Sequence, residues 1–108
     1  MDGVKYHKEL AASGRWAAMS LPKQLANIGS EVSRSIRWRE KGDQQKSEEA
    51  FWRCLELMDM TIEAAHSPAR REILRLREVL CDYFAGDNEY QTTPEWLMKY
   101  FDSFACLP

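Results

Sequence analysis

The spacing of apolar side chains in residues 21–36 limits the fold of this chain more than any other feature. Successive apolar residues are four, three, four and four positions apart, which is the repeat of one helix face and not of a strand. The stripe comprises Leu21, Leu25, Ile28, Val32 and Ile36. Ser20 is suited to cap such a helix, Pro22 fits its first turn, and Gly42 can stop it. The sequence therefore predicts a helix of about 21 residues with one buried face.

Two more helices are predicted to follow the first. Asp43 is suited to cap the second, which should run to about Ala65. Pro68 fits the start of the third, because proline suits a first helical turn and pushes the preceding residue out of helical geometry. We expect Gly86 to end this third helix in a left-handed conformation. The apolar faces comprise Phe51, Cys54, Leu55, Met58, Ile62 and Ala65 in the second helix and Ile73, Leu76, Leu80, Tyr83 and Phe84 in the third.

A fourth long helix and a short N-terminal helix complete the predicted fold. Thr92 or Thr93 caps the fourth, whose inner face comprises Leu97, Tyr100, Phe101 and Phe104. Residues 4–12 are expected to form the short helix, with Trp16 anchoring the link. Short connections between long helices favour antiparallel neighbours. The predicted fold class is therefore all-α: an antiparallel up-down four-helix bundle over residues 20–108, preceded by an N-terminal arm over residues 1–19.

The composition is typical of a cytoplasmic protein with one modest core. Fifteen basic and seventeen acidic residues give 108 residues a net charge of −2, so no global charge attracts nucleic acid or anionic membranes. The charges of residues 82–108 sum to −4 and those of the remainder to +2. This difference predicts either a solvated surface or a contact between the more basic first part of the chain and the acidic end of a neighbouring subunit. Three widely spaced cysteines without a C-x-x-C pair argue against disulfides and zinc. We find no secretory or membrane-spanning segment, and expect a cytoplasmic protein.

Catalytic and metal chemistry is poorly represented in the sequence. The two histidines are His7 and His66, and we expect His66 to lie in the last turn of the second helix, where it favours the helix dipole. Glu63 and His66 have the spacing of a di-iron motif, but the chain has no second copy. The two commonest phosphate-binding loops are also absent. We therefore predict no enzyme, cofactor or metal; an enzyme would have to rely on Glu63, His66 and Asp82.

The second predicted helix carries apolar side chains outside its main face. These are Trp52, Leu57 and Met60. Either this helix lies at the centre of the bundle, or it supplies a subunit interface. We predict a non-enzymatic interaction or oligomerisation protein, an adaptor or accessory, with a homodimer as the first expectation and another protein as a further partner.

A basic and aromatic strip supports an alternative, a nucleic-acid-associated accessory protein. Arg34, Arg37, Trp38 and Lys41 are three or four residues apart and are predicted to share one side of a helix. Interleaved acidic residues can cancel this charge, which makes a salt-bridged surface the competing interpretation. A polar network between helices is also predicted, from Glu31, Arg34, Arg77 and Asp82.

Three residues are expected to have packing roles. Gly29 lies inside the first predicted helix, where it costs about 1 kcal/mol relative to alanine, so another backbone or a large side chain should approach it closely. Asn88 is expected to shape the turn after the third helix. Tyr90 should then pack back on the bundle, with its hydroxyl toward water or a polar partner.

Two stretches of the chain resemble the recurring words of a protein family. They are LANIGSEVSR at residues 25–34 and REVLCDYFAGDNEY at residues 77–90. These are similar to the words QLANIGSEV-R and REVL-DYF--DNEY of a family of small, uncharacterised prokaryotic helical proteins. The resemblance covers most of the chain from residue 16 onward, and it implies a helical fold but no particular activity. Lys23 departs from the family, which often has an acidic residue there that would complete a capping box with Ser20.

Overall fold

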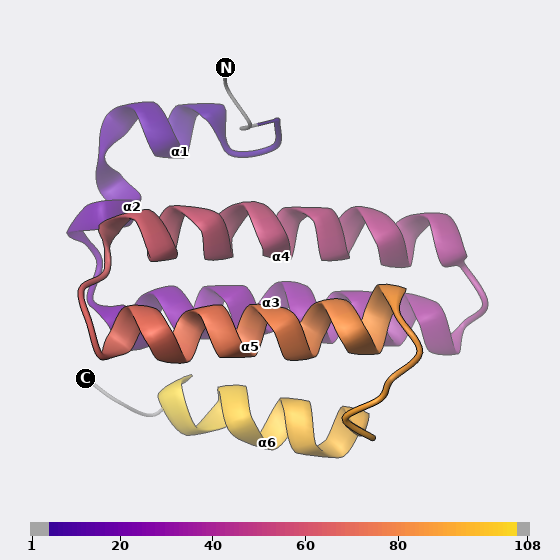
Figure 1. The fold of residues 1–108 in the computed structure, drawn as a ribbon. Helices are drawn as coiled ribbons and strands as arrows, with labels where there is room; N and C mark the ends of the chain where they lie inside the picture. Colours follow the sequence, from indigo (N-terminus) through magenta and orange to yellow (C-terminus); the bar gives the residue numbers. More distant parts are fainter. Residues whose placement is uncertain (1–4, 106–108) are drawn as a thin grey trace.

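In the computed structural model, which describes residues 5–105, the chain is entirely helical (Figure 1). The helices are α1 (Lys8–Ser13), α2 (Arg15–Ala18), α3 (Leu21–Glu40), α4 (Gln44–Ala64), α5 (Ala69–Ala85) and α6 (Pro94–Ala105). No strand occurs in these residues. The predicted all-α class is confirmed. None of the described helices is both long enough and apolar enough to span a membrane.

Three of the four long helices, α3, α4 and α6, begin where their capping residues predicted. The side chain of each cap accepts a hydrogen bond from the backbone amide three residues later, at 3.4 Å for Ser20, 3.1 Å for Asp43 and 3.1 Å for Thr93. These bonds satisfy amides that have no partner within the helix. Asp43 follows Gly42, whose φ of 83° gives the left-handed residue between α3 and α4. Of the two threonines considered, Thr93 is therefore the cap of α6.

Three predicted details near helix ends are wrong. α4 ends at Ala64, so His66 lies in the connection to α5 and not in a last helical turn. Gly86 is extended, with φ −106° and ψ −155°. The left-handed residues follow it instead, at Asn88 and Gln91 with φ of 54° and 55°. A helix can end by several routes, and here the following loop, not the glycine, reverses the chain. Finally, α1 starts later than predicted, at Lys8, while residue 4 lies outside the described residues.

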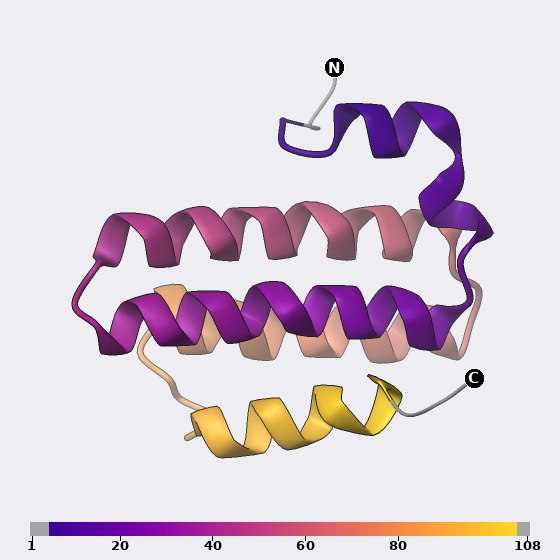
Figure 2. The same cartoon turned by 180° about the vertical axis from the view of Figure 1, so that it is seen from behind.

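The long helices pack in an open series. Figures 1 and 2 place α3 and α5 at one level, with α4 on one side of them and α6 on the other. α3 packs most extensively against α4 and next against α6, while α5 packs closely against α4. The backbone of α5 makes no comparably close contact with α3 or α6. The finer prediction of an up-down four-helix bundle is therefore not confirmed, because the close pairs run α5–α4–α3–α6 without closing.

The interior is a single cluster whose buried side chains come from every helix except α1, and the partly buried Leu10 of α1 packs against it. The buried side chains of this cluster are Trp16, Leu25, Ile28, Val32, Ile36, Phe51, Cys54, Leu55, Leu57, Met58, Ile73, Leu76, Leu80, Leu97 and Phe101. All but Leu21 of the stripe predicted for residues 21–36 is buried. A Cβ added at Gly29 would lie 2.6 Å from Cβ of Phe101, so the predicted close approach at this glycine is confirmed. Burial of these faces is the main stabilising contribution to the fold.

The N-terminal arm belongs to the same core. The indole of Trp16 is 3% exposed, and its Nε1 donates to Oγ1 of Thr61 on α4 at 3.0 Å. The backbone oxygen of Trp16 accepts from Nε2 of Gln24 at 2.7 Å. α1 contributes no buried residue and turns away from α2 at Gly14, whose φ is 76°. The predicted anchoring role of Trp16 is confirmed.

Candidate functional site

A cavity of about 480 Å³ opens between α5 and the start of α6, where the two backbones do not pack closely. We call it the aromatic cleft, and it is lined by Arg75, Glu78, Val79, Tyr90, Gln91, Thr92, Thr93 and Trp96. Its volume is in the range of small-molecule and side-chain binding sites. One wall is α5, and the other is the loop of residues 86–93 with the first turn of α6.

The loop of the aromatic cleft is held by hydrogen bonds from Asp82 on α5 and from the loop residue Asn88. The Asp82 carboxylate accepts the backbone amides of Glu89 at 2.8 Å and Tyr90 at 3.0 Å. Asn88 exchanges two bonds with the backbone of Thr92, at 2.9 and 3.0 Å. Asn88 thus shapes the turn as predicted. Together with Gln91 it is a non-glycine residue at positive φ, a conformation that persists only where its surroundings enforce it and that clusters at functional sites.

Two aromatic rings stand open to solvent in the cleft. Tyr90 is 56% exposed and Trp96 is 50% exposed. Trp96 stacks on Tyr100, with ring centroids 5.4 Å apart and planes inclined by 18°. The hydroxyl of Tyr90 donates to Oε2 of Glu78, so its predicted polar partner is present, although its ring stays exposed. The outer face of the Trp96–Tyr100 stack is therefore available to a ligand.

Carboxylates of α5 accept hydrogen bonds from the two phenols of the cleft region, Tyr90 and Tyr100. The hydrogen bond to Glu78 and the charge of Glu78 raise the pKa of Tyr90 above its ordinary value. Burial, then the charge of Glu72 and a 3.2 Å hydrogen bond to it, raise the pKa of Tyr100 to about 12. Both phenols are therefore neutral hydrogen-bond donors at pH 7.

The aromatic cleft presents aromatic rings, hydroxyl groups and the carboxylate of Glu78. No histidine or cysteine lines the aromatic cleft. Cys54 is completely buried, and this burial raises the pKa of its thiol, which disfavours the nucleophilic thiolate. Within residues 5–105, no group of three or more His, Cys, Asp or Glu side chains is placed to hold a metal ion. Glu63 and His66 are exposed, and His66 lies outside α4.

A second cavity, of about 320 Å³, lies over α4 beside the N-terminal arm. We call it the Trp52 surface, and it is lined by Lys5, Tyr6, Trp52, Leu55, Glu56, Asp59 and Arg77. Trp52 is 54% exposed and Tyr6 is 39% exposed. Of the predicted interface residues, Trp52 is therefore accessible, Met60 is half-buried, and Leu57 is only 3% exposed. Leu57 is a correction to the predicted interface, because its side chain belongs to the buried core of its own chain.

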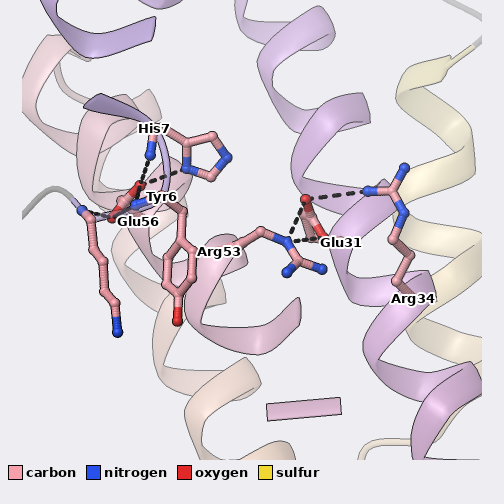
Figure 3. A network of polar contacts seen from close by, with 7 residues as sticks. Tyr6, His7, Glu31, Arg34, Arg53 and Glu56 are labelled. Atoms are coloured by element: carbon pink, nitrogen blue, oxygen red, sulfur yellow. Dashed lines mark hydrogen bonds and ion pairs between the residues drawn. The ribbon is translucent and has the colours of Figure 1, made fainter. Parts of the chain in front are cut away.

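Glu56 anchors the arm at the Trp52 surface and was not anticipated from the sequence. Figure 3 shows its carboxylate accepting the backbone amides of Lys5, Tyr6 and His7, while His7 Nδ1 lies 2.6 Å from Oε1. Burial alone would raise the pKa of Glu56, but these hydrogen bonds outweigh it and lower the pKa below its ordinary value. The available signal was a glutamate flanked by Leu55 and Leu57 on a buried helix face.

The predicted polar network separates into three parts. Glu31 contacts Arg34 at 3.2 Å and also Arg53 on α4, at 3.2 Å (Figure 3). Arg77 does not reach Asp82 but pairs with Asp59 on α4 at 2.8 Å. Asp82 binds loop amides, as described above. The pair of Glu31 and Arg34 is confirmed. The prediction that Asp82 joins a network between helices is wrong, because its carboxylate binds the backbone amides of Glu89 and Tyr90 in the loop.

Two side chains of the predicted nucleic-acid face, Trp38 and Arg34, are already in contact with other residues of the chain. The ring of Trp38 is half-buried, with the ammonium groups of Lys41 and Lys46 at 5.1 and 4.3 Å from its centroid. Arg34 pairs with Glu31, whereas Arg37 is exposed and lines, with Arg34, a shallow groove of about 250 Å³ between α3 and α6. An indole covered by lysines is poorly placed to stack a base.

Comparisons with protein-family models, with curated proteins and with solved structures found no match to this chain. The resemblance to a prokaryotic family stays a prediction. The two stretches that carry it occupy different places: residues 25–34 lie on α3 beside α6, and residues 77–90 form the end of α5 and most of the cleft loop. The candidate site therefore rests on its geometry alone.

Proposed function

We propose that this protein is a non-enzymatic adaptor that docks segments of other proteins in the aromatic cleft. One observation carries the proposal. Five large hydrophobic side chains are exposed in the described part of the chain, and four of them line two cavities: Tyr6 and Trp52 in one, Tyr90 and Trp96 in the other. Single exposed apolar residues are ordinary, but aromatic rings gathered at cavities are typical of binding sites.

The rigid loop supports this role. Binding is weakened when a site must first be ordered, and the bonds from Asp82 and Asn88 order the cleft loop before any ligand arrives. The cleft also offers what peptide recognition needs: an aromatic face on Trp96, the Val79 side chain on α5, and the Glu78 carboxylate.

The same proposal includes a homodimer through the Trp52 surface. A symmetric dimer would place Trp52 of each copy against the partner and would remove this large apolar ring from water. The scaffold in this proposal is a four-helix bundle of α3–α6. Its location is the cytoplasm, because Cys54 and Cys81 are free thiols suited to a reducing compartment.

A peptide panel tests the docking role. Synthetic decapeptides of basic, acidic, aliphatic and aromatic composition are screened by ¹H–¹⁵N NMR against the native protein, Trp96→Ala and Trp52→Ala. Trp52→Ala is the matched control, because the two indoles are about equally exposed and line different cavities. We expect at least one composition to shift the amides of residues 87–92, and Trp96→Ala alone to abolish the effect. Binding that is indifferent to Trp96, or the absence of any binding, would contradict the docking role.

Light scattering tests the dimer separately. We expect the native mass to double at high concentration and Trp52→Glu to remain monomeric, because the new carboxylate would be desolvated in the interface. A native protein that stays monomeric at millimolar concentration would eliminate the dimer without affecting the cleft.

A further inference from the structure

The charges around the aromatic cleft are one-sided. Between Arg77 and Lys99 the sequence has no basic residue, but it has the acidic residues Glu78, Asp82, Asp87, Glu89 and Glu95. This stretch supplies the end of α5, the loop and the first turn of α6, and so it builds most of the cleft. Arg75 is the one basic residue in the lining, and its guanidinium lies 3.9 Å from Glu72 on its own helix. A cationic ligand therefore suits the cleft best.

The aromatic geometry is also suited to a cation. One side of the Trp96 ring is stacked on Tyr100, while half of the Trp96 side chain remains exposed. The face of an indole attracts a cation more strongly than the faces of the other aromatic side chains. Tyr90 lies on the same wall as Trp96 and donates its hydroxyl hydrogen to Glu78 on the α5 wall, and Glu78, Asp82 and Glu89 all raise the pKa of Tyr90. Negative potential and an open indole face thus coincide in one cavity.

We propose that the aromatic cleft binds an arginine side chain of a basic segment in a partner protein. This inference rests on the proposed docking function and names the chemistry of the partner. A guanidinium is planar, so it can stack on Trp96 and donate in fork geometry to a carboxylate at the same time. A carboxylate accepts about four hydrogen bonds, so the bond from Tyr90 leaves Glu78 able to receive this fork. A lysine ammonium provides the charge but not the stacking plane.

The test compares three peptides that differ at one residue. Heptapeptides of glycine and serine carry a central arginine, lysine or citrulline, the last being the uncharged analogue of arginine. Each is titrated into the ¹⁵N-labelled native protein, and the indole signal of Trp96 is assigned from Trp96→Leu. We expect the arginine peptide to shift Trp96 and residues 87–92, with the lysine peptide weaker and the citrulline peptide at least about fivefold weaker. Raising the salt concentration should weaken the arginine peptide most.

Two variants separate the charge from the ring. Glu78→Gln removes the charge and keeps an acceptor for Tyr90, and we expect it to weaken the arginine peptide about fivefold while leaving the citrulline peptide unchanged. Trp96→Leu should weaken all three peptides, and Trp52→Leu none. Far-ultraviolet circular dichroism verifies that each variant is folded. Glu78 is exposed, so its substitution is tolerated even if Trp96→Leu is not.

Each failure has a distinct meaning. Equal affinity for the arginine and citrulline peptides would overturn the cation inference but leave a docking cleft. If only acidic or apolar decapeptides of the screening panel bind, the cation inference is likewise overturned and the docking cleft remains. If no peptide binds at all, both proposals are removed. The signals of the cleft could also shift without peptide as the protein concentration rises. If these shifts vanish in Arg37→Gln, the cleft binds a second copy of this chain, and the assignment to a different partner protein is overturned.

Discussion

Replacing Gly29 by alanine measures how closely α6 approaches α3. A Cβ at residue 29 would lie 2.6 Å from Cβ and 2.8 Å from Cγ of Phe101, where ordinary contacts are 3.4–4 Å. Phe101 is 2% exposed, and its Cβ is fixed to the α6 backbone, so the ring cannot swing aside. The whole of α6 must shift. The cleft would change with it, because Trp96 lies on the same helix.

Two opposing contributions set the magnitude. Overpacking a well-packed core costs about 1–3 kcal/mol, and a contact this short with an atom next to the backbone belongs at the upper end. Alanine in place of glycine in a helix interior gains about 1 kcal/mol. We therefore expect Gly29→Ala to lower the free energy of unfolding by about 2 kcal/mol. The melting temperature should fall by roughly 10 °C for a domain of this size.

Urea denaturation followed by circular dichroism is the assay. Ser30 provides the reference, because it is exposed on the same helix: comparing Ser30→Gly with Ser30→Ala measures the local gain from replacing glycine by alanine. Gly29→Ala should lower the midpoint without changing the slope, which reports the surface exposed on unfolding. If Gly29→Ala proves as stable as the native chain, while the Ser30 pair shows its usual difference, the argument from Phe101 is refuted.

Three further outcomes are expected. Because hydrogen bonds lower the pKa of Glu56, docking of the N-terminal arm should be complete above the ordinary carboxyl pKa and be lost as the pH falls through the lowered value. Hydrogen exchange of the amides of residues 5–7 would detect this loss. Protection of these amides that persists unchanged in strong acid would contradict the expectation. Trp16→Phe should cost about 1–2 kcal/mol in urea denaturation, because it leaves the buried Thr61 hydroxyl without its indole partner, and an unchanged midpoint would disprove that. The protein should show no detectable affinity for RNA in fluorescence anisotropy at low salt, since Arg34 is paired with Glu31. Salt-sensitive RNA binding that is lost in Arg37→Gln would restore the nucleic-acid alternative.

Local signals in the sequence determined the helices. Ser20, Asp43 and Thr93 can each satisfy an unpaired amide at a helix start, and this property depends on a few neighbouring residues. The same is true of the apolar repeats, since a helical face is defined by residues three and four apart. The close approach at Gly29 was also foreseeable, because a glycine inside a helix has a cost that packing must offset.

Contacts between distant residues were decided only by the tertiary structure. The ion pair of Arg77 with Asp59 forms only because α5 packs against α4, and the sequence did not indicate it. Leu57 looked like interface material, but the packing of the other segments makes it part of the core of its own chain. The sequence could mark Glu56 as a glutamate between two leucines but not identify its partners, because the amides that it binds are some 50 residues away along the chain.

The candidate cleft divides in the same way. Part of its lining lies in the stretch 77–90 that the sequence singled out, whereas Trp96 was not singled out, and the cleft exists because α5 packs closely against α4 and less closely against α6. The sequence by itself determined that four long helices form, where they start and which faces are apolar, because these properties follow from hydrogen bonds and periodicity within one segment. Only the tertiary structure decided which helices meet and where a gap is left between them, because that outcome depends on the summed packing of side chains from all the segments at once.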